Sequence, residues 1–210
     1  LTCSTKRMYP DVLMYDKVIE LTGSFKAPMG CRSFLQGWKD EHGQEVNSGR
    51  MNLGVVTLNL PRVAIESKGN QTMFWELFEE RLKVCHDALV YRVQRTKDAL
   101  PENAPILYEY GAFGKRLKKG DSVDDLFKNK RSTISLGYIG LYEAATVFFG
   151  PEWEKNETAK AFTVNILSKM KQHTDQWGEK YGYHFSVYST PSESLTDRFC
   201  RLDTKKFGVL

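Results

Sequence analysis

Apolar residues recur every three or four positions along two long stretches of the chain, at 72–98 and at about 156–177. This spacing places them on one face of an α-helix, so both stretches are predicted as amphipathic helices packed against a core. Thr72 is the expected N-cap of the first helix. The predicted inner faces hold Met73, Leu77, Leu82, Cys85 and Leu89 in the first helix, and Ala159, Phe162, Ile166, Met170, His173 and Trp177 in the second.

Shorter apolar runs between these helices predict strands. "LGVVTLNLP" at 53–61 is β-branched and apolar and ends at a proline, which is typical of a buried strand. The run at 132–150 begins as a strand and is expected to become helical after Gly140, and "YHFSVY" at 183–188 alternates as a strand does. A further helix is expected to start at Pro191. Strands that alternate with long helices predict the α/β fold class.

The rest of the chain carries weaker patterns. Residues 99–133 are rich in proline and glycine and are predicted as loops, with one brief strand at 106–110. Residues 11–21 fit either a short strand or a helix. His173 is expected to be a paired residue of the core or its rim rather than a metal ligand.

Size and composition are those of an ordinary globular protein. The chain has 210 residues, of which 41% are hydrophobic and 27% charged, and no apolar run approaches the roughly 18 residues of a membrane span. It begins without methionine and without a signal peptide, so we expect a piece of something longer. The net charge of +4 is spread out, and the basic runs at 114–120 and 128–131 are predicted as solvated loops. Neither nucleic acid nor a membrane is an expected partner.

Four cysteines stand at positions 3, 31, 85 and 200, and none belongs to a Cys-x-x-Cys pair. A structural metal site within this chain is therefore not expected, and the low count indicates a reducing compartment, the cytoplasm. Cys85 fits a small hydrophobic residue of the helix core. Cys31 differs, because "PMGCRSF" places it in a turn shaped by Pro28 and Gly30.

Three interpretations of Cys31 are open. It fits a buried structural thiol, a nucleophile whose pKa Arg32 would lower, or a neutral thiol that relays a hydrogen atom. A nucleophile needs a base, and the four histidines show no spacing that nominates one. A relay through the S–H group needs no base and favours an apolar site that excludes water.

Two further places have the polar groups of a site. Asn52, in "GRMNLG", either hydrogen-bonds a local turn or presents its amide to a small polar molecule. "VYSTPSES" suits a capping box, with Thr190 as N-cap, Pro191 as first helical residue and Glu193 three positions after the cap. The same helix start, with hydroxyls of Ser192 and Ser194, also fits a phosphate site.

Four motifs, in order along the chain, resemble those of the catalytic subunit of anaerobic (class III) ribonucleotide reductases. They are "MGCRSFL", "GRMNLGVVTLNLPRVA", "SLGYIGLYE" and "FSVYSTPSESLTDRF", and the similarity runs from about Pro10 to Gly208. The resemblance implies that residues 1–210 are one segment of a ten-stranded α/β barrel of the glycyl radical enzyme type. A central finger loop would lie at about 26–37.

The resemblance also implies an activity and a set of site residues. The activity is the anaerobic reduction of ribonucleoside triphosphates to 2′-deoxyribonucleoside triphosphates by thiyl radical chemistry. Cys31 would carry the thiyl radical, and Asn52 would lie near the substrate hydroxyls and formate, the usual reductant. The implied substrate phosphate site comprises Ser189, Thr190, Ser192, Glu193 and Ser194.

Parts of the family's machinery have no counterpart in this chain. These are the radical glycine and the zinc site of the C-terminal region, the N-terminal regulatory nucleotide domain, and a second active-site cysteine. The implied partners are the rest of the subunit or a complementary split chain, a radical SAM activating enzyme that generates the glycyl radical, and a second copy of the full subunit. We expect residues 1–210 alone to have no reductase activity. The alternatives are a non-catalytic nucleotide- or partner-binding barrel segment and a cysteine-nucleophile enzyme.

Overall fold

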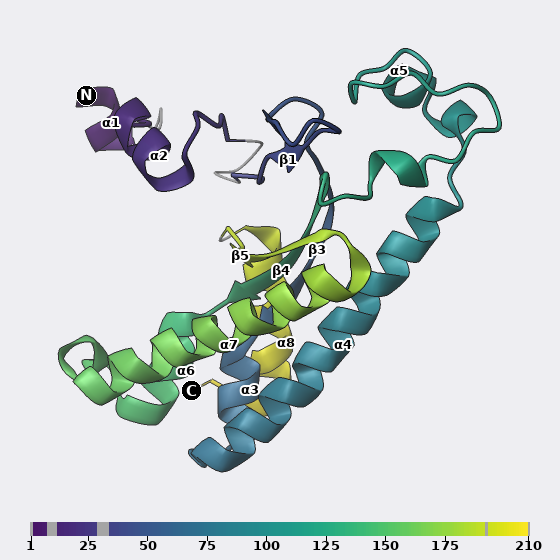
Figure 1. The fold of residues 1–210 in the computed structure, drawn as a ribbon. Coiled ribbons are helices and arrows are strands. Elements are labelled where there is room, and N and C mark those ends of the chain that lie inside the picture. Colours follow the sequence, from purple (N-terminus) through teal and green to yellow (C-terminus); the bar gives the residue numbers. More distant parts are fainter. Residues whose placement is uncertain (1, 8–11, 29–33, 192, 210) are drawn as a thin grey trace.

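A three-stranded parallel sheet lies at the centre of the structure (Figure 1). The computed structural model describes residues 2–7, 12–28, 34–191 and 193–209. Strands β3 (Met51–Asn59), β4 (Ser132–Ile139) and β5 (His184–Ser189) pair in that order. The predicted α/β class is therefore confirmed, whereas the sheet of the described residues is open and does not close into a barrel.

Helices connect the strands and cover one face of the sheet (Figure 1). The α-helices are α1 (Thr2–Arg7), α2 (Tyr15–Thr22), α3 (Leu60–Glu66), α4 (Gln71–Lys97), α5 (Pro105–Tyr108), α6 (Leu141–Phe149), α7 (Glu157–Tyr181) and α8 (Ser194–Phe207). Short 3-10 turns occur at Pro101–Asn103, Asp124–Leu126 and Trp153–Lys155, and a small antiparallel ribbon pairs β1 (Trp38–Lys39) with β2 (Glu45–Val46). No helix of the described residues is long and apolar enough to cross a bilayer.

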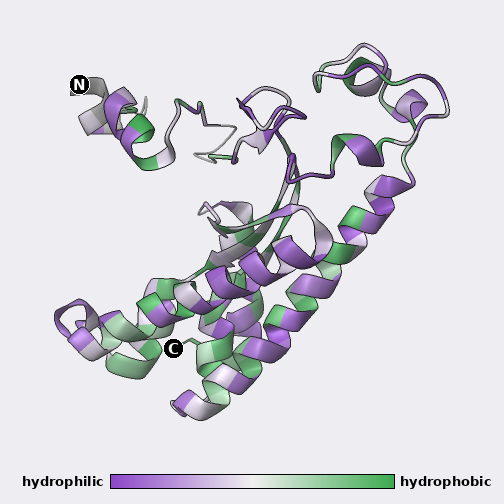
Figure 2. Ribbon diagram, in the orientation of Figure 1, coloured by the Kyte–Doolittle hydropathy of each residue, from purple (hydrophilic) through white to green (hydrophobic). Residues whose placement is uncertain are grey.

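The core lies between the sheet and the two long helices. α4 packs on β3 and α7 on β5, and their apolar faces meet over Ile134 and Leu136 of β4, which are 1% and 0% exposed. Figure 2 shows the apolar residues of both helices as stripes along otherwise polar helices. Burying each large apolar side chain contributes about 1.5–3 kcal/mol, so this layer accounts for most of the fold's stabilisation.

The two predicted helices are confirmed, with small corrections at the start of the first. Leu82, Cys85 and Leu89 are buried as predicted, as are Ala159, Phe162, Ile166, Met170 and Trp177. Asn70 rather than Thr72 caps α4, because its Oδ1 accepts a hydrogen bond from the backbone N–H of Met73 at 3.1 Å. Met73 is 40% exposed, and Phe74 takes the inner position at the first turn.

Two boundary predictions were wrong, each for a reason of helix capping. The strand expected at 106–110 is the short helix α5, because Pro105 fits the first turn of a helix. The proline at 61 does more than end β3: it is the second residue of α3, and Asn59 Oδ1 caps that helix by accepting from Arg62 N at 3.2 Å. For residues 11–21, which the sequence left open between a strand and a helix, the structure has helix α2 from Tyr15.

Candidate functional site

The sheet face opposite the helices carries polar and small side chains. Because β-strand side chains alternate between faces, the residues that come before and after each core residue along a strand point to the opposite face. Register places Asn52, Thr133 and His184 in one row, Val55, Ser135 and Ser186 in the next, and Thr57, Gly137 and Tyr188 in the third. We call this surface the polar face. The Ser135 and Ser186 hydroxyl oxygens lie 3.3 Å apart on it.

A groove of about 730 Å³ lies over the polar face. Its floor includes Thr133, Ser135 and Ser186, and the turn 189–191 after β5 forms part of its wall. Residues 34–36 line it as well. These residues directly follow the segment that carries Cys31, so two of the motifs singled out in the sequence border one cavity.

Thr190 meets Thr57 at the carboxyl end of the sheet. Their hydroxyl oxygens are 3.0 Å apart, and Thr190 N donates to the backbone oxygen of Tyr138 at 3.2 Å. Gly137 lies beneath the pair, and a Cβ atom there would come within 2.6 Å of Thr57 Oγ1. Ligands of parallel sheets generally bind at this end of the strands. The turn after β5 is thus fixed directly onto the sheet.

The predicted capping box is wrong. α8 starts at Ser194, and its N-cap is Glu193, whose side chain makes no capping hydrogen bond. Thr190 lies before the helix, because its hydroxyl and its N–H are both used in contacts with the sheet. Ser189 and Thr190 border the groove, whereas Glu193 and Ser194 are exposed at the helix start. Ser192 lies outside the described residues.

Asn52 occupies the other end of the polar face. It pairs with Thr133 at the amino end of the strands, about 15 Å from Thr57 by strand rise, and its side chain is exposed. Its Oδ1 accepts a hydrogen bond from Gly54 N at 2.9 Å, at a β-bulge between Asn52 and Gly54. This is the local turn contact of the structural interpretation. Asn52 is not among the residues that border the groove.

Two lysines, each paired with a carboxylate, lie near His184 at the amino end of the groove. Burial, followed by the charges of Lys130 and Lys171, lowers the pKa of His184 below its ordinary value. Lys171 itself borders the groove and forms an ion pair with Asp175, and Lys130 pairs with Glu179 at 2.7 Å. His184 is therefore held in its neutral form, which donates and accepts hydrogen bonds.

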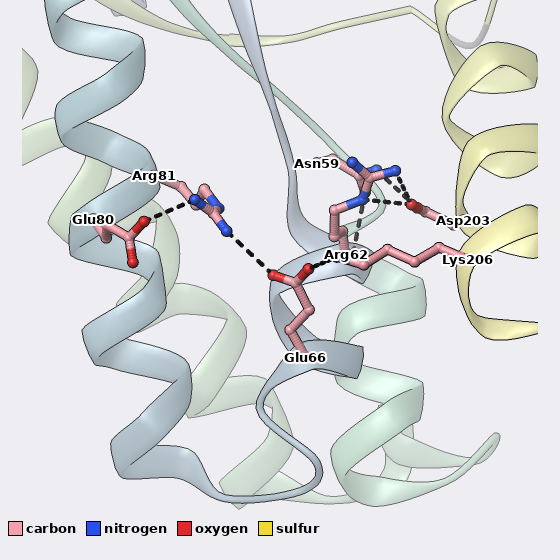
Figure 3. Close-up of polar contacts among 7 residues, drawn as sticks. All are labelled: Asn59, Arg62, Glu66, Glu80, Arg81, Asp203 and Lys206. Atoms are coloured by element: carbon pink, nitrogen blue, oxygen red, sulfur yellow. Dashed lines mark hydrogen bonds and ion pairs between the residues drawn. The ribbon is translucent and has the colours of Figure 1, made fainter.

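Helix α8 is attached to the rest of the structure through polar contacts (Figure 3). Asp203 accepts from Asn59 Nδ2 at 2.8 Å and from Arg62 Nε at 2.6 Å, and it also pairs with the Arg62 Nη2 group. Lys206 pairs with Glu66 of α3, which Arg81 of α4 approaches at 3.5 Å. No residue of α8 in the described part of the chain is buried. These ion pairs therefore fix the helix that follows β5.

Cys31 lies outside the described residues, and Cys85 and Cys200 do not form a site together. Cys85 is 6% exposed in the core, as predicted, and burial raises the pKa of its thiol to about 11. Cys200 is exposed on α8. His173 pairs with Glu79 at 3.0 Å at the rim of the core, which confirms its interpretation as a paired rim residue.

The basic runs have structural explanations. Lys115, Arg116, Lys118 and Lys119 are exposed, as predicted for a solvated loop. Arg131 departs from that prediction, because it is 7% exposed and lies over the Trp38 ring at 4.7 Å. Its Nε donates to Gly49 O at 3.4 Å, which ties the loop before β4 to the turn before β3.

Sequence reasoning missed most of the polar face. Thr57, Ser135 and Ser186 were read only as parts of strands. The signal was present, since polar residues recur at every second position from His184 to Thr190. That alternation indicates that one face of the last strand is polar. Which residues of the other strands lie beside it, such as Thr57 and Gly137, depends on the strand order.

A parallel sheet with helices on one face and a polar groove on the other defines an α/β segment with a groove over its sheet. The family model described as anaerobic ribonucleoside-triphosphate reductase matches residues 1–209. The chain therefore belongs to this family.

Individual relatives agree with this assignment. The anaerobic ribonucleoside-triphosphate reductase of Salmonella typhimurium is 53% identical over 211 residues, which cover 100% of this chain and 30% of that protein. The chain thus spans under a third of that relative's length. The crystal structure of the anaerobic ribonucleotide reductase from Thermotoga maritima with citrate in the active site has a TM-score of 0.62 and 21% identity, over 82% of this chain and 30% of that one. A structure of the Thermotoga maritima enzyme in complex with dATP and CTP has a TM-score of 0.60 and 21% identity, over 84% of this chain and 28% of that one.

Proposed function

We propose that this chain is a segment of the catalytic barrel of an anaerobic ribonucleoside-triphosphate reductase, supplying the finger-loop cysteine and part of the substrate phosphate site. The observation that carries the proposal is the groove over the polar face. Residues 34–36, which follow Cys31, border it together with Ser189 and Thr190. A nucleotide in this groove would have its phosphates at the carboxyl end of the sheet and its ribose toward the finger loop.

The chemistry follows from the family. The Cys31 thiyl radical would take the 3′ hydrogen atom of the ribose, and the 2′ hydroxyl would leave as water. Formate would be oxidised to carbon dioxide, supplying the two electrons of the reduction, and the thiol would return the hydrogen atom to the 3′ carbon. Holding sulfur and C3′ in near contact while excluding water is the protein's main contribution. The radical itself would arise on a glycine of another segment.

The residues of the groove suit a polyanionic substrate. Thr190, Ser189 and the backbone N–H groups at the start of α8 are hydrogen-bond donors at the favourable end of a helix dipole. Lys171 would add a positive charge along the groove, and neutral His184 would add a further hydrogen-bond donor. Asn52, on the same face, would lie nearer the ribose hydroxyls than the phosphates. Closure of the sheet into a ten-stranded barrel would cover the polar face with further strands.

Substitution of Cys31 in the complete subunit tests the proposal. The subunit is activated with its radical SAM partner, and the glycyl radical is quantified by electron paramagnetic resonance before turnover. Cys31→Ser is expected to retain the radical and to form no deoxyribonucleotide. Cys85→Ser, in the core, serves as the matched cysteine control and is expected to retain turnover. A fully active Cys31→Ser subunit would leave only the binding-module interpretation. Rapid alkylation of Cys31 at neutral pH would favour a nucleophile.

A further inference from the structure

One guanidinium group lies between the two stems of the 28–34 segment. Arg50 Nη1 donates to Leu35 O at 2.8 Å, on the stem that follows the segment. Its Nη2 donates to Ala27 O at 3.3 Å, on the stem that precedes it, and its Nε donates to Asn47 O at 2.6 Å. A single side chain therefore holds three main-chain carbonyls, two of which flank the segment that carries Cys31.

Only arginine offers this set of contacts. Its planar group presents donors in a fixed fork, whereas a lysine ammonium is a point charge with one centre. Hydrogen bonds to a charged donor contribute about 1.5–3 kcal/mol each. Arg50 is partly buried, and burial lowers the pKa of its guanidinium below the ordinary value. The group remains charged, because the ordinary pKa of arginine lies far above neutral pH.

Further contacts hold both stems against neighbouring residues. On the first stem, Lys26 is 5% exposed and pairs with Glu45 of β2 at 2.8 Å. On the second stem, Leu35 is 4% exposed, and Trp38 Nε1 donates to Ser48 O at 3.0 Å. Arg50 directly precedes β3, so its hydrogen bonds connect both stems to the start of a strand of the central sheet.

We propose that Arg50 is a positioning residue that fixes both stems of the 28–34 segment against the start of β3, and so sets the distance from Cys31 to the polar face. The inference rests on the proposed function. Arg50 does not border the groove and is not proposed to touch substrate. Its loss is expected to lower kcat more than it raises KM, because the turn 189–191, which the proposed function places at the phosphates, is held separately by the contact between Thr190 and Thr57.

The test uses the complete subunit with its activating enzyme and the variants Arg50→Ala and Arg50→Lys. Arg95→Ala, which removes an exposed arginine of α4, is the matched control. Misplacement of a reacting group by about 1 Å costs up to roughly 100-fold in rate, so kcat of Arg50→Ala is expected to fall about 10- to 100-fold. The glycyl radical yield and KM are expected to stay within about twofold of the wild type. Arg50→Lys is expected to recover only part of kcat.

Chemical rescue separates positioning from a general loss of structure. Millimolar guanidinium is expected to raise kcat of Arg50→Ala and to leave Arg95→Ala unchanged. The proposal is overturned if Arg50→Ala has wild-type kcat. It is equally overturned if kcat, KM, radical yield and the unfolding temperature all worsen together and guanidinium restores none of them.

Cys31→Ser, measured in the same series, distinguishes failure of the positioning role of Arg50 from failure of the proposed function. An active Cys31→Ser subunit overturns the proposed function itself. An inactive Cys31→Ser subunit beside a fully active Arg50→Ala subunit overturns the role of Arg50 alone.

Discussion

The hydroxyl oxygens of Thr57 and Thr190 lie 3.0 Å apart, although the two residues are 133 positions apart in the chain. They come from the first strand of the sheet and from the turn after the last, and they meet across the middle strand. This contact is possible because position 137 has no side chain. The position of Thr190, which borders the groove, therefore depends on two residues from two other motifs.

Gly137→Ala is expected to destabilise the chain and to displace the 189–191 turn. The added methyl group would lie 2.6 Å from Thr57 Oγ1 and 2.9 Å from Val55 Cγ1. Overpacking of this kind typically costs about 1–3 kcal/mol. Urea unfolding measures the free-energy change. Ser135→Ala on the same strand is the control and is expected to change stability by less, since it removes an atom instead of adding one. Equal stability of Gly137→Ala and wild type would contradict the packing argument.

Thr190→Val is expected to raise KM for the ribonucleoside triphosphate in the complete subunit. The substitution keeps the side-chain shape and removes a hydroxyl that the proposal assigns to the phosphates. A lost hydrogen bond to a charged group corresponds to about 1.5–3 kcal/mol, or roughly a 10- to 100-fold increase. Steady-state kinetics with one substrate measures it.

Thr57→Val is the matched control for Thr190→Val, because it breaks the same hydroxyl pair from the other side. If Thr190 binds phosphate, Thr57→Val raises KM much less. Identical KM values for the two variants would show that the hydroxyl of Thr190 serves the sheet contact only.

The Arg62–Asp203 pair is expected to couple strongly in a double-mutant cycle. Asp203 is 13% exposed at its side chain and accepts hydrogen bonds from both Asn59 and Arg62. We expect a coupling of about 1–3 kcal/mol between Arg62→Ala and Asp203→Ala. The Arg201–Asp197 pair, on the same helix but exposed at 76% and 62%, is the comparison and is expected to give about 0.3–0.5 kcal/mol. Coupling no larger than that of the surface pair would refute the anchoring of α8.

Much of the fold was predictable because it depends on local periodicity. The spacing of Leu82, Cys85 and Leu89 identified the inner face of α4 without any knowledge of its neighbours. Gly140 was correctly placed between β4 and α6, since glycine favours its φ of 78°. Helix ends were less predictable, because Asn70 competed with Thr72, and Glu193 with Thr190, for the cap.

The site was harder to predict because it depends on which strands are neighbours. Thr57, Gly137 and Thr190 have ordinary local roles, and only the order β3-β4-β5 brings them together. Arg50 had no sequence signal, since its partners are main-chain carbonyls that any residue offers. The motifs near 52 and 190 were identified, and the structure places them at opposite ends of one face.

The thiol of Cys85 is expected to make stability depend on pH in the alkaline range. Burial raises its pKa from 9.0 to about 11, so the folded state keeps a proton that the unfolded state has lost. The contribution is fully present below about pH 9 and is lost as the pH rises to about 11. This loss amounts to roughly 2 kcal/mol.

Cys85→Ala isolates this contribution from that of the buried tyrosines. At pH 8 the variant is expected to be about 1 kcal/mol less stable than the wild type, because it leaves a small cavity. This difference in the free energy of unfolding is expected to become smaller or change sign near pH 11. A gap that stays constant with pH would mean that Cys85 does not titrate in this way.

The position of the Cys31 sulfur relative to a bound substrate tests the central claim most directly. The measurement is a crystal structure of the complete subunit with a ribonucleoside triphosphate in the groove. Our account predicts the Cys31 Sγ within about 4 Å of the ribose C3′, the contact that hydrogen transfer needs. It also predicts the phosphates at the turn 189–191 and the start of α8. A thiol on the outer surface, or phosphates bound away from that turn, would contradict it.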